Sequence, residues 1–320
     1  MDNRKDSMTI DIRPLREDDL DTADHIARIA FGTFVGLPEP ETFMGDADYV
    51  RTRWRTEPSG AFAAEYSGEV VGSNFATHWG SVGFFGPLTI RPDLWDRGIG
   101  RLLLEPIIDC FDRWQTTHTG LFTFAESPKH VGLYQRFGFW PRFLTAVMSK
   151  TVDPNHTAPT AIRFSELTAA EQDSAVTECR ELTSELFDGL DLTTEIRAVA
   201  DQGLGETVLL WDDASVAGVA VCHYGAGTEA GSGTCYIKFG AARPGPGAET
   251  AFFQLLDTVE SLSATNGLAR IAAGVNTARH EAYSGMLARG FRTDIQGVAM
   301  HRPNSDGYSR PGAFVIDDWR

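Results

Sequence analysis

The stretch LTIRPDLWDRGIGR, residues 88–101, joins an apolar strand to a helix through a basic turn that contains two glycines. In such a turn successive backbone N–H groups point into one concavity, which can hold a diphosphate. Gly98 and Gly100 permit close approach of a ligand to the backbone, and Arg97 and Arg101 would add charge-assisted contacts. A glycine pair of this kind also precedes many helices for structural reasons alone. The turn by itself is therefore compatible with a diphosphate site and with a purely structural helix start.

Alternating and helical apolar patterns on both sides of this turn predict a mixed α/β domain. The strands are expected at 9–15, 61–66, 70–79, 81–90, 119–125 and 138–150, and the helices at 18–30, 41–54, 101–114 and 130–137. The turn lies between the strand 81–90 and the helix 101–114.

The second half of the chain repeats this order, with strands at 161–167, 207–213, 215–225, 269–275 and 290–302, a strand followed by a glycine turn over 234–247, and helices at 169–187 and 251–264. Three glycine landmarks keep nearly constant separations of 146, 147 and 152 residues: Gly72 with Gly218, Gly98 with Gly245, and Gly138 with Gly290. A duplication explains this register. We predict two domains, 1–152 and 160–320, joined by a proline-containing linker over 152–160.

Composition restricts the class of protein. The 320 residues are 42% hydrophobic and 22% charged, which is typical of globular domains. There is no run of eighteen apolar residues, and the polar start leads directly into a strand. We therefore expect a cytoplasmic protein without a membrane partner.

Net charge restricts the possible binding partners, and the spacing of cysteines and histidines bears on metal sites and disulfides. The formal net charge is −16, which disfavours nucleic acid and would attract a cationic amine, although a saline habitat or a GC-rich genome can produce the same balance. The four cysteines and eight histidines show no ligand spacing. We expect no metal and no disulfide framework.

The order of elements and two motifs resemble the GNAT (GCN5-related) N-acetyltransferase family in its tandem two-domain form. The first motif is Ile90-Arg91-Pro92 followed by Gly98-Ile99-Gly100, and the second is Tyr134-Gln135-Arg136-Phe137-Gly138-Phe139 after Leu133. Both lie at the spacing typical of the family. Trp95 and Ser127 depart from the Gln or Arg and the Asn that the family commonly has there.

This resemblance implies two α/β domains, each with a mostly antiparallel central sheet flanked by helices, and acetyl-CoA or another acyl-CoA as cosubstrate. It also assigns roles. The backbone of Leu88, Thr89 and Ile90 would pair with the pantetheine, and the pyrophosphate would lie on the turn with Ser127 nearby. The turn residues are Trp95, Asp96, Arg97, Gly98, Ile99, Gly100 and Arg101.

The resemblance makes Tyr134 the acid that protonates the departing thiolate, with a core aromatic residue as the alternative. A base or a water chain must accept the proton of the attacking amine. Glu126, directly after the strand 119–125, is the candidate, with His78 and His130 as further options. Glu126 could instead cap the following helix.

The second copy departs further from the family pattern. Pro244 and Pro246 remove N–H groups from its turn, and Met286 stands four residues before Gly290, where the first copy has Tyr134. We expect this copy to serve as a scaffold, a dimer surface or an acceptor-site wall; catalysis by it is the alternative. The apolar tail 314–319 should pack on the body of the protein.

The resulting hypothesis is an acetyl- or acyl-CoA-dependent N-acetyltransferase whose first copy is active and whose acceptor is a primary amine, most simply that of a small molecule. Antibiotic modification, a biosynthetic tailoring step and protein lysine acetylation all remain open as the setting, and so does a homodimer. A non-catalytic acyl-CoA sensor is the alternative, suggested by Trp95, Ser127 and the altered second copy. A pair of purely structural domains is the third possibility.

Overall fold

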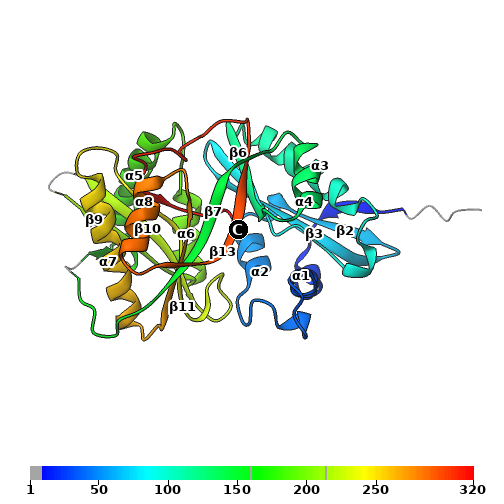
Figure 1. Ribbon diagram of the computed structural model, residues 1–320, viewed down its shortest axis with the longest axis horizontal. Coiled ribbons are helices and arrows are strands. Elements are labelled where there is room, and N and C mark those ends of the chain that lie inside the picture. Colours follow the sequence, from blue (N-terminus) through cyan, green and yellow to red (C-terminus); the bar gives the residue numbers. More distant parts are fainter. Residues whose placement is uncertain (1–8, 159–160, 213–214) are drawn as a thin grey trace, which may run out of the picture. The chain divides into compact units, whose positions relative to one another are not determined.

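The computed structural model describes residues 9–158, 161–212 and 215–320 (Figure 1). Two of the expected linker residues, Pro159 and Thr160, and Asp213 at the end of an expected strand lie outside them. The chain forms two compact units. Unit 1 comprises residues up to Gly45, Tyr49–Thr77 and Phe85–Arg113, and unit 2 comprises Asp46–Asp48, His78–Phe84 and Trp114–Arg320.

Unit 1 contains a small sheet. Strand β1 (Asp11–Pro14) pairs with β2 (Ala61–Tyr66), β2 with β3 (Glu69–Trp79), and β3 with the short β5 (Thr89–Ile90), all antiparallel. Strand β2 alternates between two cores, because Ala61 and Ala63 pack in the cluster that includes α1 (Leu20–Phe34), whereas Ala64 packs in the cluster that includes α3 (Ile99–Arg113). This period of two places one helix layer on each face.

Two expectations for this part of the chain are wrong. The predicted helix 41–54 is a 3-10 turn at Pro40–Thr42 followed by α2 (Tyr49–Thr56), because Met44 and Gly45 adopt positive φ and end helical geometry between them. The predicted strand 81–90 is divided into β4 (Val82–Phe85) and β5. The division falls at Gly86-Pro87, where Gly86 has a φ of 144° and Pro87 has no N–H to donate to a ladder.

The first-copy strands of unit 2 are interleaved with second-copy strands. The sheet runs from β4 to β6 (His118–Phe124), then β13 (Arg292–Arg302), β7 (Trp140–Thr151) and β12 (Arg270–Asn276). The closing strand of each copy therefore pairs with the strand of the other copy that precedes its short helix, α4 (Pro128–Gln135) or α8 (His280–Ala288). A sequence pattern identifies strands but does not choose their partners, so this exchange was not predicted.

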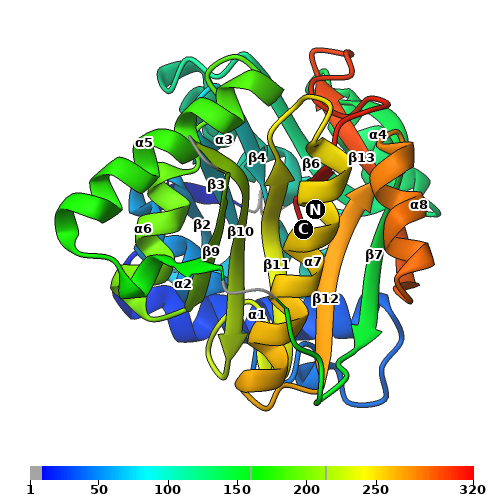
Figure 2. The ribbon, with the colours of Figure 1, turned by 90° about the vertical axis from the view of Figure 1, so that its left-hand side faces the viewer.

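The second-copy part of the sheet continues through β11 (Gly231–Ala242), β10 (Val216–Gly225), β9 (Gly205–Trp211) and β8 (Ile162–Arg163). Figure 2 shows β9, β10 and β11 side by side, with α7 (Ala248–Thr265) next to β11 on the viewer's side. The chain-end strand β14 (Val315–Ile316) pairs with β11. The tail expected to pack does so, since Phe314 and Trp319 are both buried.

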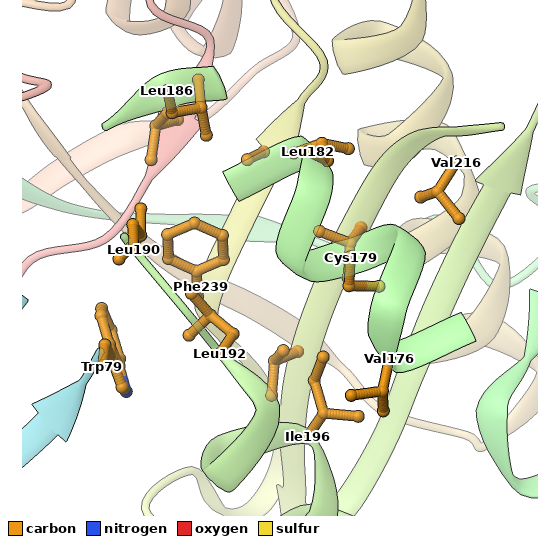
Figure 3. Packing of buried hydrophobic residues seen from close by; sticks show 14 of the residues in the cluster. Trp79, Val176, Cys179, Leu182, Leu186, Leu190, Leu192, Ile196, Val216 and Phe239 are labelled. Atoms are coloured by element: carbon orange, nitrogen blue, oxygen red, sulfur yellow. The ribbon is translucent and has the colours of Figure 1, made fainter. Parts of the chain in front are cut away.

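Two cores cover the opposite faces of this sheet. One includes Phe252 and Leu255 of α7. The other includes residues of α5 (Ala169–Leu186) and α6 (Thr193–Gln202), such as Cys179 and Ile196, together with Phe239 and Trp79 (Figure 3). Helix α6 was not predicted from the sequence, although Gly203 ends it in the left-handed conformation that often follows a helix.

The division into compact units does not follow the sequence repeat, because the interleaved strands hold the end of the first copy in unit 2. Internal similarity and compactness are different criteria, so the predicted domains 1–152 and 160–320 stay a prediction. Of the helices in the described ranges, none combines the length and the apolar character needed to cross a bilayer.

Two buried histidines of unit 2 make stability depend on pH. His118 and His301 lie edge to face with ring centroids 4.8 Å apart, and each ring also packs near Trp319. Burial lowers the pKa of His118 to about 3, with His301 acting in the same direction. Burial also lowers the pKa of His301 to about 4, opposed by its hydrogen bond with the Ser305 carbonyl.

We therefore predict that the free energy of unfolding falls as the pH drops below 6.5, because the unfolded chain binds protons that the folded chain excludes. Each histidine should contribute about 2 kcal/mol of this loss between pH 7 and pH 5. His118→Phe should flatten the dependence in urea unfolding, whereas the exposed His280→Phe should not. Parallel curves for the wild type and His118→Phe would contradict the assignment.

Candidate functional site

The turn after β5 is built by alternating helical and left-handed backbone. The segment Pro92–Leu94 forms a 3-10 turn, and Asp96 and Gly98 then adopt positive φ of 65° and 81°. Helix α3 begins immediately afterwards at Ile99. Glycine suits position 98 because of its backbone conformation, and a Cβ added there would meet no atom within 4 Å.

The turn presents backbone donors. Among the described residues, the amide N–H groups of Gly98, Ile99 and Gly100 donate no backbone hydrogen bond, whereas the next N–H, that of Arg101, donates to the Gly98 carbonyl at 3.1 Å. Three successive donors at the start of a 15-residue helix carry its positive dipole end. This arrangement suits an anion such as a diphosphate.

The side chains of the turn divide into structural and exposed groups. The Trp95 indole N–H donates to the Ile90 carbonyl at 2.8 Å, and Arg91 binds Asp93 at 2.8 Å. Both contacts fold the turn onto the end of β5. Arg97 and Arg101 are exposed, and Arg101 lies 3.3 Å from Glu105 in a pair that solvent screens. Trp95, which departs from the family pattern, therefore supports the turn from within it.

The predicted pantetheine segment is the edge formed by Leu88 and β5. Thr89 pairs with Ser73 and Ile90 with Gly72, and the Arg91 N–H donates to the Val71 carbonyl at 2.9 Å. A Cβ on Gly72 would lie 2.6 Å from the Thr89 carbonyl oxygen, so glycine is required for this close approach. The landmark glycine of the sequence repeat thus has a packing reason.

The other predicted residues belong to unit 2. Tyr134 on α4 is buried and is hydrogen-bonded to Thr123 of β6. Burial raises the pKa of Tyr134, and the contact with Thr123 opposes this rise. The phenol consequently stays protonated through the neutral range, which is the state that a general acid needs. A buried tyrosine with a polar partner also suits a structural role, so both interpretations of Tyr134 continue.

The candidate bases differ in environment. Glu126 is exposed, and within the described part of the chain its side chain has no ion pair and forms no cap on α4. His78 stacks on Trp114 with ring centroids 5.0 Å apart. Burial lowers the pKa of His130, with a further contribution from Lys129. Ser127 is the buried N-cap residue of α4. The site assignments of these residues stay predictions.

The equivalent helix of the second copy has the same backbone and a different side chain. The Phe139 N–H donates to the Tyr134 carbonyl at 3.2 Å, and the Phe291 N–H donates to the Met286 carbonyl at 3.1 Å. Met286 therefore stands at the position of Tyr134, as the repeat predicted. It is fully buried in the core beside α7 and has no ionisable group.

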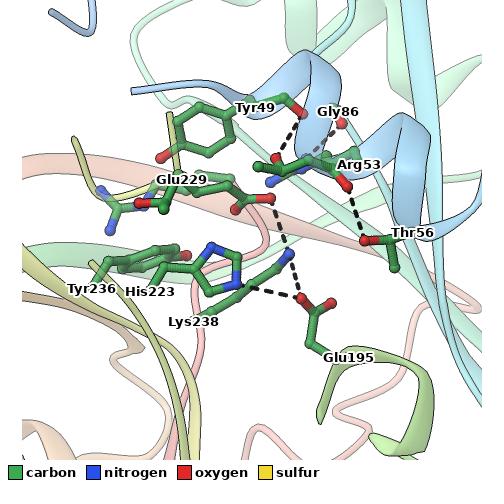
Figure 4. Close-up of polar contacts among 12 residues, drawn as sticks. Tyr49, Arg53, Thr56, Gly86, Glu195, His223, Glu229, Tyr236 and Lys238 are labelled. Carbon is green, nitrogen blue, oxygen red and sulfur yellow. Dashed lines mark hydrogen bonds and ion pairs between the residues drawn. The ribbon is translucent and has the colours of Figure 1, made fainter. Parts of the chain in front are cut away.

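Unit 2 contains a cluster of buried charges that was not predicted from the sequence (Figure 4). The Lys238 ammonium lies 2.7 Å from Glu195 and 2.9 Å from Glu229, and His223 lies 3.6 Å from Glu195. The Trp79 indole N–H donates to the other Glu195 oxygen at 3.2 Å. Its signal was present, because a lysine interrupts the apolar run CYIKFGAA, residues 235–242. The pairing of β11 with β10 shifts by one residue at Lys238, because Val221 pairs with Phe239 and Cys222 pairs with Ile237.

This cluster fixes the charge state of Glu195. Burial alone would raise the pKa of Glu195, but the Lys238 ammonium together with His223 holds it at about 2. Glu195 is therefore a carboxylate at neutral pH and pairs with a cation inside the protein. Among the described residues, no group of three or more His, Cys, Asp or Glu side chains is arranged to hold a metal ion.

Figure 4 also draws a buried arginine of unit 1. Arg53 of α2 donates to the Gly86 carbonyl at the interruption between β4 and β5, and its guanidinium lies 5.1 Å from the centre of the Tyr49 ring. The contact supports the Gly86-Pro87 segment that precedes the predicted pantetheine edge.

We predict that Lys238→Met lowers the free energy of unfolding by about 3–5 kcal/mol, because it leaves two buried carboxylates without their cation. The matched change Arg197→Met removes an exposed ion pair with Asp173 and should cost less than about 1 kcal/mol. Urea unfolding at pH 7 measures both. Equal losses in the two variants would show that the buried cluster has no special stabilising role.

Comparison with known proteins is consistent with the sequence resemblance. Residues 25–139 match the model of the acetyltransferase (GNAT) family. A search of curated proteins by sequence finds no match. Solved structures with similar folds are numerous.

A proposed acetyltransferase from Pyrococcus horikoshii aligns with a TM-score of 0.69 at 15% identity, covering 97% of this chain and 95% of that one. A GCN5-related N-acetyltransferase from Sphaerobacter thermophilus gives a TM-score of 0.57 at 16% identity, with coverage of 95% and 96%. A tandem GNAT protein from the clavulanic acid biosynthesis pathway gives a TM-score of 0.57 at 13% identity, covering 92% of this chain and 98% of that one. At these identities the likeness shows the fold alone. The family match assigns residues 25–139 to the acetyltransferase (GNAT) family, whose members are acyltransferases.

Proposed function

We propose that this protein is an N-acetyltransferase that moves an acetyl group from acetyl-CoA to a primary amine of a small molecule, using its first copy. The observation that carries the proposal is the row of amide N–H groups at Gly98, Ile99 and Gly100, which donate no backbone hydrogen bond among the described residues. It lies inside the segment that matches the family model. In the proposed complex this row binds the diphosphate of the cosubstrate, and Arg97 and Arg101 add positive charge.

The proposed reaction follows the family resemblance. The amine nitrogen attacks the thioester carbonyl carbon, the carbon–sulfur bond breaks, and the departing sulfur takes its proton from the Tyr134 hydroxyl. The nitrogen gives up a proton to a base, for which Glu126 is the first candidate, or to water. The Tyr134 phenol is protonated at neutral pH and so has a proton to give, while the burial that raises its pKa makes it a weaker acid than an exposed phenol.

The charge of the chain supports an amine acceptor. A net charge of −16 attracts cations and repels nucleic acid, so a protonated amine is the favoured partner to approach the protein. The acceptor must lose a proton before it can attack, which is the reason for a base. A cytoplasmic location belongs to the same proposal.

The first test concerns the acid. Tyr134→Phe should lower kcat about 10²-fold or more and leave the KM for acetyl-CoA nearly unchanged, because it removes one proton and keeps the ring. Tyr283→Phe in the second copy is the matched control and should have wild-type activity. The measurement is release of free thiol from acetyl-CoA across a panel of amines. Unchanged turnover in Tyr134→Phe would remove the tyrosine from the mechanism.

The second test concerns the turn. Gly98→Ala should weaken acetyl-CoA binding about tenfold or more, because a side chain disfavours positive φ and points toward the space assigned to the diphosphate. Gly267→Ala is matched, since Gly267 also has a positive φ and open space around its Cβ position. Calorimetry with acetyl-CoA compares the two. Tight binding with no turnover for any amine would favour the sensor, and no binding would favour a structural role.

A further inference from the structure

Strand pairing aligns the cofactor edge of the first copy with a segment of the second. In the first copy Gly72 pairs with Ile90 and Ser73 with Thr89. In the second copy Gly218, the partner of Gly72 in the repeat, pairs with Ala242, and the next residue pairs with Ala241. The equivalence extends one residue further. The Arg91 N–H donates to the Val71 carbonyl, one residue before Gly72, and the Arg243 N–H donates to the Ala217 carbonyl, one residue before Gly218. Thr89 and Ile90 therefore correspond to Ala241 and Ala242.

The edge of the second copy at these positions is already paired with the end of the chain. Ala241 pairs with Val315 and Gly240 with Ile316 in antiparallel register. The Ala242 N–H donates to the Phe314 carbonyl at 3.0 Å. The backbone of 314–316 thus makes, on β11, the type of strand pairing that pantetheine is proposed to make on the first copy.

The tail also lies against β12. Strands β11 and β12 pair in parallel from Thr234–Arg270 to Ile237–Ala273 and no further among the described residues. At the next position a Cβ on Gly274 would lie 2.1 Å from an oxygen of Asp318, so the tail fills the space beside that glycine. The chain end therefore lies between the two strands where their direct pairing ends.

Buried polar contacts fix the tail in this place. Arg279, which is 1% exposed, binds Asp317 at 2.8 Å and donates to the Val315 carbonyl at 3.1 Å. The Tyr236 hydroxyl donates to Asp318 at 3.0 Å. Displacing the tail would leave Arg279 buried without its carboxylate, which is a large penalty.

We infer that residues 314–318 are a built-in ligand of the second copy and close its cofactor edge, so that each chain binds one CoA molecule. This inference rests on the proposed function, because it takes the CoA site of the first copy as the reference. The two substituted features of the second copy, Met286 and the proline-bearing turn, agree with a site that no longer binds cosubstrate.

The test combines hydrogen exchange with calorimetry on the full chain, using CoA as the probe. We expect the amides of 314–316 to exchange slowly without CoA and at the same rate with saturating CoA. Calorimetry should give one CoA per chain, and Gly98→Ala should weaken that single event. Two CoA molecules per chain, or faster tail exchange on adding CoA, would overturn the inference while leaving the proposed function intact.

A variant that removes the anchor of residues 314–318 provides a second test. Arg279→Met should speed exchange of the tail amides at least tenfold, whereas Arg289→Met, which removes a more exposed ion pair with Asp257, should not change it. If no CoA binds to any variant, the proposed function fails, and slow exchange of the tail in the wild type would still support the docked tail. Unprotected tail amides in the wild type would overturn the inference irrespective of CoA.

Discussion

The backbone hydrogen bonds of four adjacent strands, β6, β13, β7 and β12, are the constraint on which unit 2 depends. Each closing strand completes the sheet of the other copy, so neither copy can satisfy all of its backbone donors and acceptors alone. An unpaired buried peptide group costs more free energy than a hydrogen bond gains, and this makes the exchange hard to undo. It also explains why compactness divides the chain differently from the sequence repeat.

The second copy shares local backbone features with the first and differs from it in side chains. The backbone of the second copy keeps the left-handed glycine and the same carbonyl contact after its short helix, while its tyrosine position is a core methionine. Its helix α7 begins three residues sooner after the Arg-Pro pair than α3 does in the first copy. The backbone after the short helix is therefore shared between the copies, while the side chain at the tyrosine position of the second copy packs in the core.

The buried charges of unit 2 add specificity to a core that is otherwise apolar. Lys238 satisfies two carboxylates from different segments, and Arg279 satisfies Asp317 and a tail carbonyl. Such groups stabilise only the arrangement in which every partner is present, because a wrong register leaves a charge buried and unpaired. The cluster and the tail anchor therefore select one arrangement of strands and loops around β11.

The sequence by itself determined the local elements, the repeat and the family motifs. Period-two and helical apolar patterns predict β2, β3, α3 and β12 closely, since a few neighbouring residues settle which face is buried. The turn 95–101 could also be assigned from sequence, because glycine at position 98 reflects a backbone conformation that is local.

Only the tertiary structure decided which strands pair, where the tail lies and which charges meet. The contacts of Lys238 with Glu195, of Arg279 with Asp317 and of Ala241 with Val315 join residues that are tens of positions apart in the chain. Their formation depends on the folding of everything between them. Apolar periodicity is a short-range signal, whereas a sheet partner or a buried ion pair is selected by the free energy of the whole packed arrangement.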